Sequence, residues 1–127
     1  MDNNFNNEEK ADLSISLDVI YHLLEDHIFH LYMKNLFNSS NKYVCIYSSN
    51  VDGGWAKHVK HRKFTNWIDK YMSINWKIKE YIPNKYPFDP KNVETTSFSD
   101  FYFYEKIKCK LSIIIQILLQ LIIFYFI

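Results

Sequence analysis

Three basic side chains with the potential for chemistry lie close together: His58, His61 and Arg62. They follow a strongly apolar segment, and such a cluster could bind an anionic or carbonyl-bearing substrate. The spacing His58-x-x-His61 could also suggest a metal ion, but no third ligand is evident nearby, so we predict no metal site. The structural alternative is a solvated cationic loop that binds nothing.

A second candidate is the pair Asp18 and His22, which lies at the end of another apolar run. An imidazole can accept a proton from a nucleophile, because its pKa lies near neutral pH. The alternative is that Asp18 caps the following helix and His22 merely packs.

Aromatic and sulfur-containing side chains give weaker signals. Trp55 and Trp67 could stack on a substrate, although packing in the core or in a loop is the commoner fate of tryptophan. Tyr47 resembles a pocket-lining residue only by its position at the end of an apolar run. Cys45 lies within that run and is expected to be a buried, inert thiol. Its distance from Cys109 indicates no metal site, and free thiols fit a reducing, cytoplasmic location.

The composition restricts the classes of partner. The 127 residues are enough for one domain, and 48% of them are apolar. Fifteen basic and 14 acidic side chains give a net charge of +1, and Arg62 is the only arginine. Nucleic-acid-binding domains usually show a strong basic excess, so we expect no nucleic-acid partner. Residues 1–10 have no apolar core, so we predict a disordered N-terminus rather than a secretory signal.

The apolar pattern predicts an α/β chain. Residues 11–18 are expected to form a short buried strand, and the helical period from 20 to about 41 predicts a helix whose main part begins near Glu25 and Asp26. A strand over 42–49, covered on both faces, a loop over 50–60 and a helix over 61–72 follow. Residues 76–82 predict a further strand, 83–96 a proline-containing loop, and 97–106 the last strand.

This order, β-α-β-α-β-loop-β, predicts parallel pairing wherever a helix connects two strands. The last two strands are joined without a helix, so we expect them to pair antiparallel at the edge of the sheet.

The segments DLSISLDVIYHL (12–23), YVCIYSSN (43–50), HVKHRKFTNWI (58–68), IPNKYPFDP (82–90) and TSFSDFYFYEK (96–106) together resemble class I S-adenosylmethionine-dependent methyltransferases. The resemblance covers roughly residues 11–106, as a methyltransferase-like partial domain. It implies a partial Rossmann-like sheet corresponding to strands four to seven of that family, with the last strand antiparallel.

The resemblance also implies site residues. Ser16, Leu17 and Asp18 would line the pocket of the cofactor, S-adenosylmethionine, and Asp18 and His22 would lie at the catalytic centre. Tyr47, His58, His61 and Arg62 are the candidates for binding a small methyl acceptor.

One departure from the family affects activity. The family's Gly-rich turn holds the cofactor, and an acidic residue on the next strand holds its ribose, but the only glycines here, Gly53 and Gly54, lie in a later loop. We therefore expect a fragment that is inactive alone. Its sheet should have an unpaired edge and a bare face, which a partner chain could complete.

The segment 111–127 is foreign to the resemblance and carries no charge. As a helix it would span roughly 26 Å, just short of a ~30 Å hydrocarbon core. Two interpretations remain open: a C-terminal anchor of a small membrane-associated interaction protein, or sequence translated beyond a frameshift.

Overall fold

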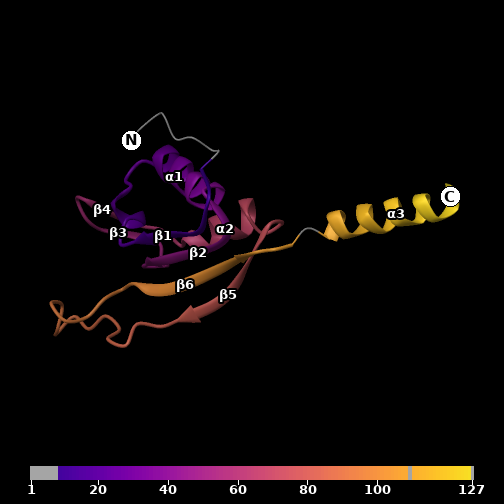
Figure 1. Cartoon of the computed structure of the whole chain (residues 1–127). Helices are drawn as coiled ribbons and strands as arrows, with labels where there is room; N and C mark the ends of the chain where they lie inside the picture. Colours follow the sequence, from indigo (N-terminus) through magenta and orange to yellow (C-terminus); the bar gives the residue numbers. More distant parts are fainter. Residues whose placement is uncertain (1–8, 109, 127) are drawn as a thin grey trace.

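The computed structural model describes residues 9–108 and 110–126, without the side chains at 54, 55 and 110–113. The prediction of a disordered N-terminus falls mainly on residues 1–8, which lie outside the described residues, as do Cys109 and the side chain of Trp55. The chain is an α/β protein built on a four-stranded mixed sheet (Figure 1). Its strands are β1 (Ala11–Leu17), β2 (Ser40–Ser48), β5 (Trp76–Ile82) and β6 (Asp100–Lys106), in the spatial order β1-β2-β6-β5.

The pairing of the last two strands is confirmed: β5 and β6 are antiparallel. Parallel pairing is confirmed only for β1 and β2, because β6 inserts between β2 and β5 and runs antiparallel to both. The long loop after β5 allows this, since it returns the chain to the hydrogen-bonding edge of β2. The strand β5 is therefore at one edge of the sheet and β1 at the other.

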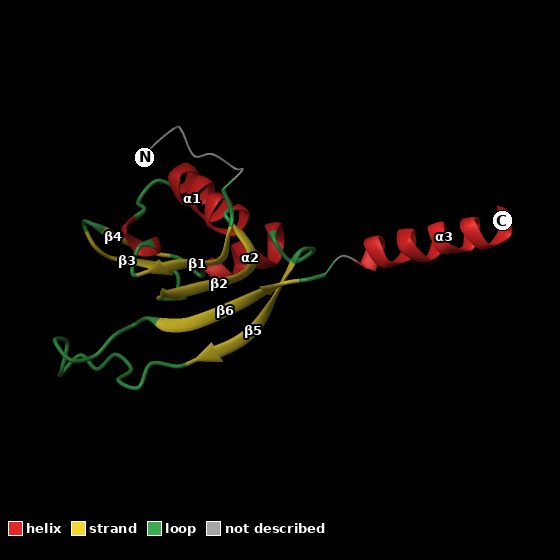
Figure 2. Cartoon of the chain, in the orientation of Figure 1, coloured by secondary structure: helices red, strands yellow, loops and turns green. Residues whose placement is uncertain are grey.

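Two helices, α1 (Asp26–Asn38) and α2 (Phe64–Tyr71), cover the same face of the sheet (Figure 2). Their apolar residues recur at three- and four-residue steps, so each helix presents one apolar stripe to the strands. The core between the layers contains Phe29, Met33, Phe37, Val44, Ile46, Phe64, Ile68, Tyr102 and Tyr104.

Some of the predicted element bounds were wrong. The predicted helix over 20–41 is a 3-10 turn, η1 (Ile20–His22), followed by α1. Leu23 interrupts the helical path, because its backbone is extended with φ −85° and ψ 92°. Asp26 begins α1, where its carboxylate suits the positive end of the helix dipole.

The segment 50–60 was predicted to be a loop, but it contains most of a two-stranded hairpin, β3 (Gly53–Ala56) and β4 (Val59–His61). The strands are only four and three residues long, which is too short for a clear alternating pattern. Gly53 has a φ of 153°, a conformation that residues with a side chain disfavour.

The second face of the sheet, which we call the open face, has no helix on it among the described residues. Strand register places on it the apolar or aromatic residues Leu13, Ile15, Leu17, Tyr43, Cys45, Tyr47, Phe101 and Phe103, and at the end beside Tyr43 the charged residues Glu105 and Lys77. The prediction that 11–18 forms a fully buried strand is therefore wrong: Leu13, Ile15 and Leu17 are 44–54% exposed. The strand β1 has an unpaired edge, and among the described residues the open face is bare. Cys45 is buried as predicted, because Ile15 and Phe103 flank it.

The C-terminal helix α3 (Lys110–Phe126) extends away from the sheet (Figure 1). Its apolar side chains from Ile114 onward are about half-exposed or more. Within the described part of the chain, none of the helices combines the length and the apolar character that crossing a membrane requires.

Candidate functional site

The carboxyl ends of β1 and β2 meet at one end of the sheet, and residues of the loop between β5 and β6 share a cavity there with Tyr21 and His61. In open α/β sheets, ligands bind beyond this end of the strands. A small cavity of about 240 Å³ lies here, which we call the strand-end pocket. It is lined by Tyr21, Val59, His61, Phe88, Val93, Thr96, Ser97, Phe98 and Ser99.

Asp18 lies at the entrance to this region, directly after β1. Its backbone has a φ of 53°, in the left-handed region that few residues other than glycine adopt. The Asp18 amide donates to the carbonyl of Tyr47 at 2.8 Å, which fixes this turn to the end of β2. The Ser99 hydroxyl donates to the Asp18 carboxylate at 2.9 Å and connects it to the pocket wall. Unusual backbone conformations concentrate at functional sites, so we include this turn in the candidate site.

Tyr21 and His61 bring two titratable groups to the pocket. Burial, with a hydrogen bond to Asp18, raises the pKa of Tyr21, so its phenol keeps its proton at neutral pH. Burial lowers the pKa of His61, so its imidazole is neutral there. The two rings are 5.6 Å apart between centroids.

The orientation of the His61 ring is set by Ser49. The Ser49 hydroxyl lies 2.5 Å from His61 Nδ1, and both side chains are buried. His61 is the last residue of β4, so the hairpin carries the imidazole onto the end of β2, where Ser49 immediately follows the strand. The neutral imidazole is the group of this pocket that could accept a proton from a bound molecule.

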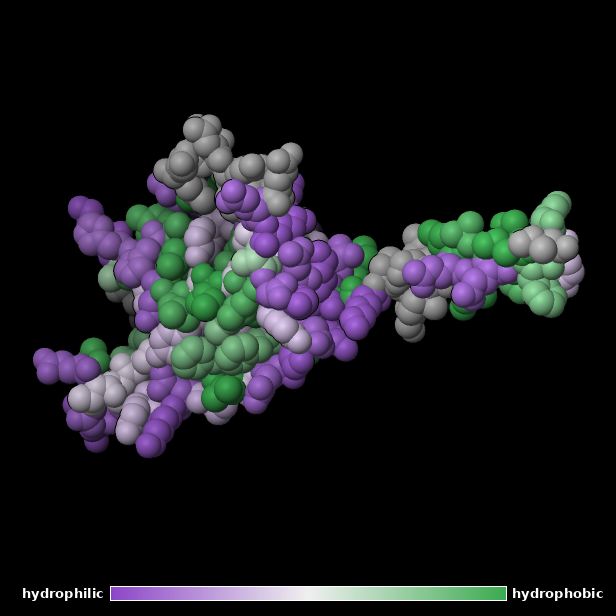
Figure 3. All heavy atoms as spheres, viewed as in Figure 1, coloured by the Kyte–Doolittle hydropathy of each residue, from purple (hydrophilic) through white to green (hydrophobic). Residues whose placement is uncertain are grey.

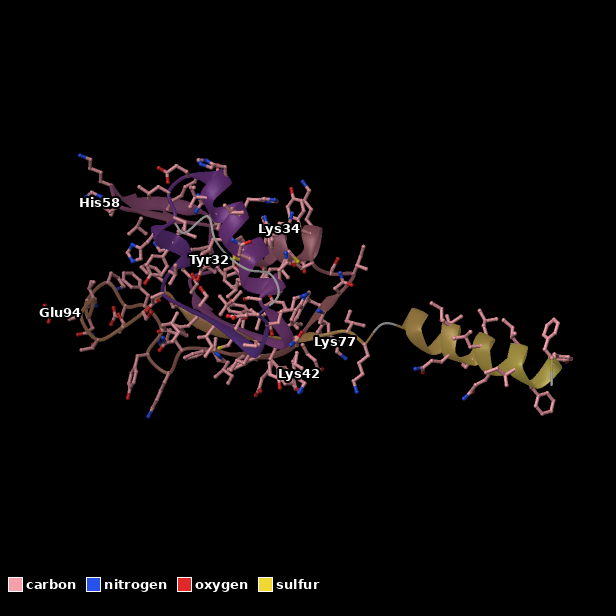
Figure 4. All side chains as sticks on the ribbon, turned by 45° about the horizontal axis from the view of Figure 1, so that its top comes forward. Tyr32, Lys34, Lys42, His58, Lys77 and Glu94 are labelled. Atoms are coloured by element: carbon pink, nitrogen blue, oxygen red, sulfur yellow. The ribbon has the colours of Figure 1, made fainter. Side chains whose placement is uncertain are left out.

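The predicted cofactor-binding residues point in different directions. Ser16 is buried on the helix side of the sheet, where its hydroxyl accepts a hydrogen bond from Tyr32 of α1 at 2.9 Å (Figure 4). Leu17 lies on the open face and is half-exposed. Only Asp18 faces the strand-end pocket, through Ser99.

The two predicted catalytic residues, Asp18 and His22, also have different surroundings. The His22 ring is exposed and lies against Tyr21, with 4.6 Å between ring centroids, and it does not line the pocket. His61, three residues after His58, is the imidazole that lines the pocket instead.

The predicted acceptor-binding residues are also divided. His61 lines the pocket, and Tyr47 borders it: the Tyr47 hydroxyl donates to Ser97 at 3.2 Å and accepts from Asn84 at 2.8 Å. His58 is exposed at the turn of the β3–β4 hairpin, away from the pocket (Figure 4).

Arg62 has a structural role, so its assignment to substrate binding needs correction. Its guanidinium is buried and donates to the carbonyl oxygens of Leu23 and Leu24 and to the carboxylate of Asp26. It also lies 4.6 Å from the centre of the Phe29 ring. All three guanidinium nitrogens therefore donate hydrogen bonds to the segment that connects η1 to α1. Trp67 likewise packs, with its indole N–H on His30 of α1 at 3.0 Å.

Sequence reasoning missed most of the pocket wall. Phe88, Phe98, Ser97 and Ser99 belong to the loop that follows β5, and the segments IPNKYPFDP (82–90) and TSFSD (96–100) of the resemblance gave the only signal for them. Phe88 and Phe98 stack with centroids 3.7 Å apart, although ten residues separate them in the chain. Among the described residues there is no group of three or more potential metal ligands.

The chain was compared with models of protein families, with curated proteins and with solved structures, and none of them matches it.

Proposed function

We propose that this chain supplies the acceptor-binding half of an S-adenosylmethionine-dependent methyltransferase. The proposal rests on the resemblance of residues 11–106, and one structural observation supports it: Asp18, Tyr21 and His61 converge at the carboxyl ends of two parallel strands. A strand-helix-strand-helix-strand-strand order with an antiparallel last strand is also what the resemblance implies.

The pocket suits a small molecule that has both an apolar ring and a hydroxyl or amine. Phe88 and Phe98 offer an aromatic wall, and Thr96, Ser97 and Ser99 offer hydroxyl groups. In methyl transfer the acceptor loses a proton as its lone pair attacks the methyl carbon. His61, neutral at working pH, would take that proton. Tyr21, whose hydroxyl donates to Asp18, would contact the acceptor through its ring as part of the pocket wall.

The cofactor is expected to need further protein. The described residues have no Gly-rich turn between a strand and a helix. Among the described carboxylates at the ends of β1 and β2, only that of Asp18 contacts the pocket wall. A partner chain adding strands along the free edge of β1 would place its own strand ends beside Asp18. The isolated chain is therefore proposed to be inactive.

Calorimetry tests the cofactor side of the proposal. Titration of the isolated chain with S-adenosylhomocysteine should show no binding in the micromolar range. Micromolar binding would contradict the need for a second half.

Nuclear magnetic resonance tests the acceptor side. Phenol, as a probe, should shift the ring signals of Tyr21 and His61, while those of His58 on the exposed hairpin turn serve as the internal control. Shifts confined to residues outside the strand-end pocket would remove the acceptor site.

A further inference from the structure

Within the part of the chain that the structure describes, two apolar surfaces are left uncovered. The open face exposes Leu13, Ile15 and Leu17, and α3 exposes apolar residues such as Leu118, at 52%. Figure 3 shows apolar side chains gathered over β1 and β2, and again along α3. A helix that is apolar around most of its circumference is normally buried, so α3 requires a surface that matches it.

The two surfaces fit each other in length. The 17 residues of α3 span roughly 26 Å at 1.5 Å per residue. The seven residues of β1 or β6 span roughly 23 Å at 3.3 Å per residue. One helix is therefore long enough to cover the apolar part of the open face, and would turn the two-layer fold into three layers.

The sheet of the same chain is poorly placed to receive α3. The Ile107 amide donates to the carbonyl of Asn75 at 2.7 Å, so the chain is still fixed beside β5 one residue beyond β6. Only residues 108 and 109 remain before α3 to reverse its direction. In the structure the helix points away from its own sheet, which leaves it accessible to the sheet of another molecule (Figure 1).

We propose that α3 packs on the open face of a second copy of this chain, so that two chains exchange helices in a symmetric homodimer. Each chain supplies one helix and one sheet face, which makes the contact self-complementary and closed. The proposal does not depend on the proposed function, because it uses the open face and α3 rather than the strand-end pocket or the outer edge of β1.

The polar residues of α3 indicate which side of the helix faces water. Gln116 and Gln120 are four residues apart and lie on one side of the helix. A single polar strip is visible along the otherwise apolar helix in Figure 3. Leu118 is about 200° around the helix from Gln116 at 100° per residue, so it faces the sheet when the glutamines face solvent.

Light scattering after size-exclusion chromatography tests the proposal on the full chain. The unsubstituted chain should have the mass of a dimer at micromolar concentration. Leu118→Lys on α3 and Ile15→Lys on the open face should each shift it to monomer, with at least a tenfold rise in the dissociation constant. Gln116→Lys introduces the same charge on the same helix and should leave the dimer intact. Circular dichroism checks that each variant keeps its secondary structure.

Cross-linking gives a second measurement that does not depend on destabilising variants. Two variant proteins are made in a Cys45→Ser, Cys109→Ser background, one with Ile15→Cys and the other with Leu118→Cys. The two proteins are mixed and treated with a flexible bismaleimide. A cross-linked heterodimer is expected. As the control, Lys34→Cys, on the outer side of α1, takes the place of Ile15→Cys and should not link.

Four results would overturn the proposal. Two concern the oligomeric state: a monomeric native chain, or a dimer that neither lysine variant affects. Two concern the cross-link: equal linking by the control, or, in a single chain made to carry both cysteines, linking only within that chain. Flotation of the chain with phosphatidylcholine vesicles, abolished by Leu118→Lys but not by Ile15→Lys, would instead assign α3 to a lipid surface.

Discussion

At the scale of single residues, the useful distinction is between side chains that the fold has already engaged and those that face the strand-end pocket. Arg62 and Ser16 look functional in the sequence, but their polar atoms are satisfied by Leu23, Leu24 and Asp26 and by Tyr32 respectively. His61 differs, because Ser49 engages only its Nδ1 and the ring still forms part of the pocket wall. It is therefore the residue whose titration most directly reports on the site.

The stability of the chain should depend on pH through His61. Burial lowers its pKa below the usual 6.5, so the unfolded chain binds this proton more readily than the folded chain. The contribution is fully favourable above pH 6.5 and declines as the pH falls from 6.5 to the folded pKa. Urea unfolding between pH 7.5 and 5 should show this decline, and His61→Gln should reduce its slope.

His58→Gln is the matched control, because it removes an exposed imidazole from the same hairpin. An unchanged slope in His61→Gln, or an equal reduction in His58→Gln, would show that His61 is not responsible. Following the His61 ring signal by nuclear magnetic resonance gives the folded pKa directly.

At the scale of elements, the helix layer depends on a few long-range connections between segments that are short by themselves. The helix α2 has eight residues, too few to be stable alone in water, and packing of Phe64 and Ile68 holds it on the sheet. The turn η1 and the start of α1 are fixed to β4 by Arg62, which is 36 or more residues away from its partners.

Arg62→Lys should destabilise the fold by about 2–3 kcal/mol, because an ammonium group at this buried position cannot reproduce the hydrogen bonds of three guanidinium nitrogens. Denaturant unfolding measures the loss. Lys60→Gln is the control: Lys60 binds the same carboxylate of Asp26, but in an exposed ion pair, and its removal should change little. Equal effects of the two substitutions would contradict a structural role specific to Arg62.

At the scale of the whole molecule, the described residues form one well-packed layer interface and leave one sheet face bare, with α3 apart from both. Large exposed apolar surfaces usually mark interaction sites. The proposed exchange of helices would bury both surfaces at once, and it makes the stability of the chain depend on the amount of dimer.

The midpoint of thermal unfolding should therefore rise with protein concentration by mass action. A tenfold dilution should lower the midpoint by a few degrees in the unsubstituted chain, because a tenfold change in concentration corresponds to about 1.4 kcal/mol. Scanning calorimetry at several concentrations measures this. Leu118→Lys should have a midpoint independent of concentration, and the same independence in the unsubstituted chain would argue against a dimer.

The sequence by itself determined the α/β class, the bounds of β5, the first residues of α1 and the burial of Cys45. These features follow from the local apolar periodicity and from the preferences of residue types for the ends of helices and strands, both of which depend on near neighbours in the sequence. Only the tertiary structure decided that β6 inserts between β2 and β5, that Leu13, Ile15 and Leu17 face an uncovered surface, and that His61 rather than His22 reaches the pocket. Each of these depends on contacts between segments far apart in the chain, and an apolar pattern shows which residues avoid water without showing which surface covers them.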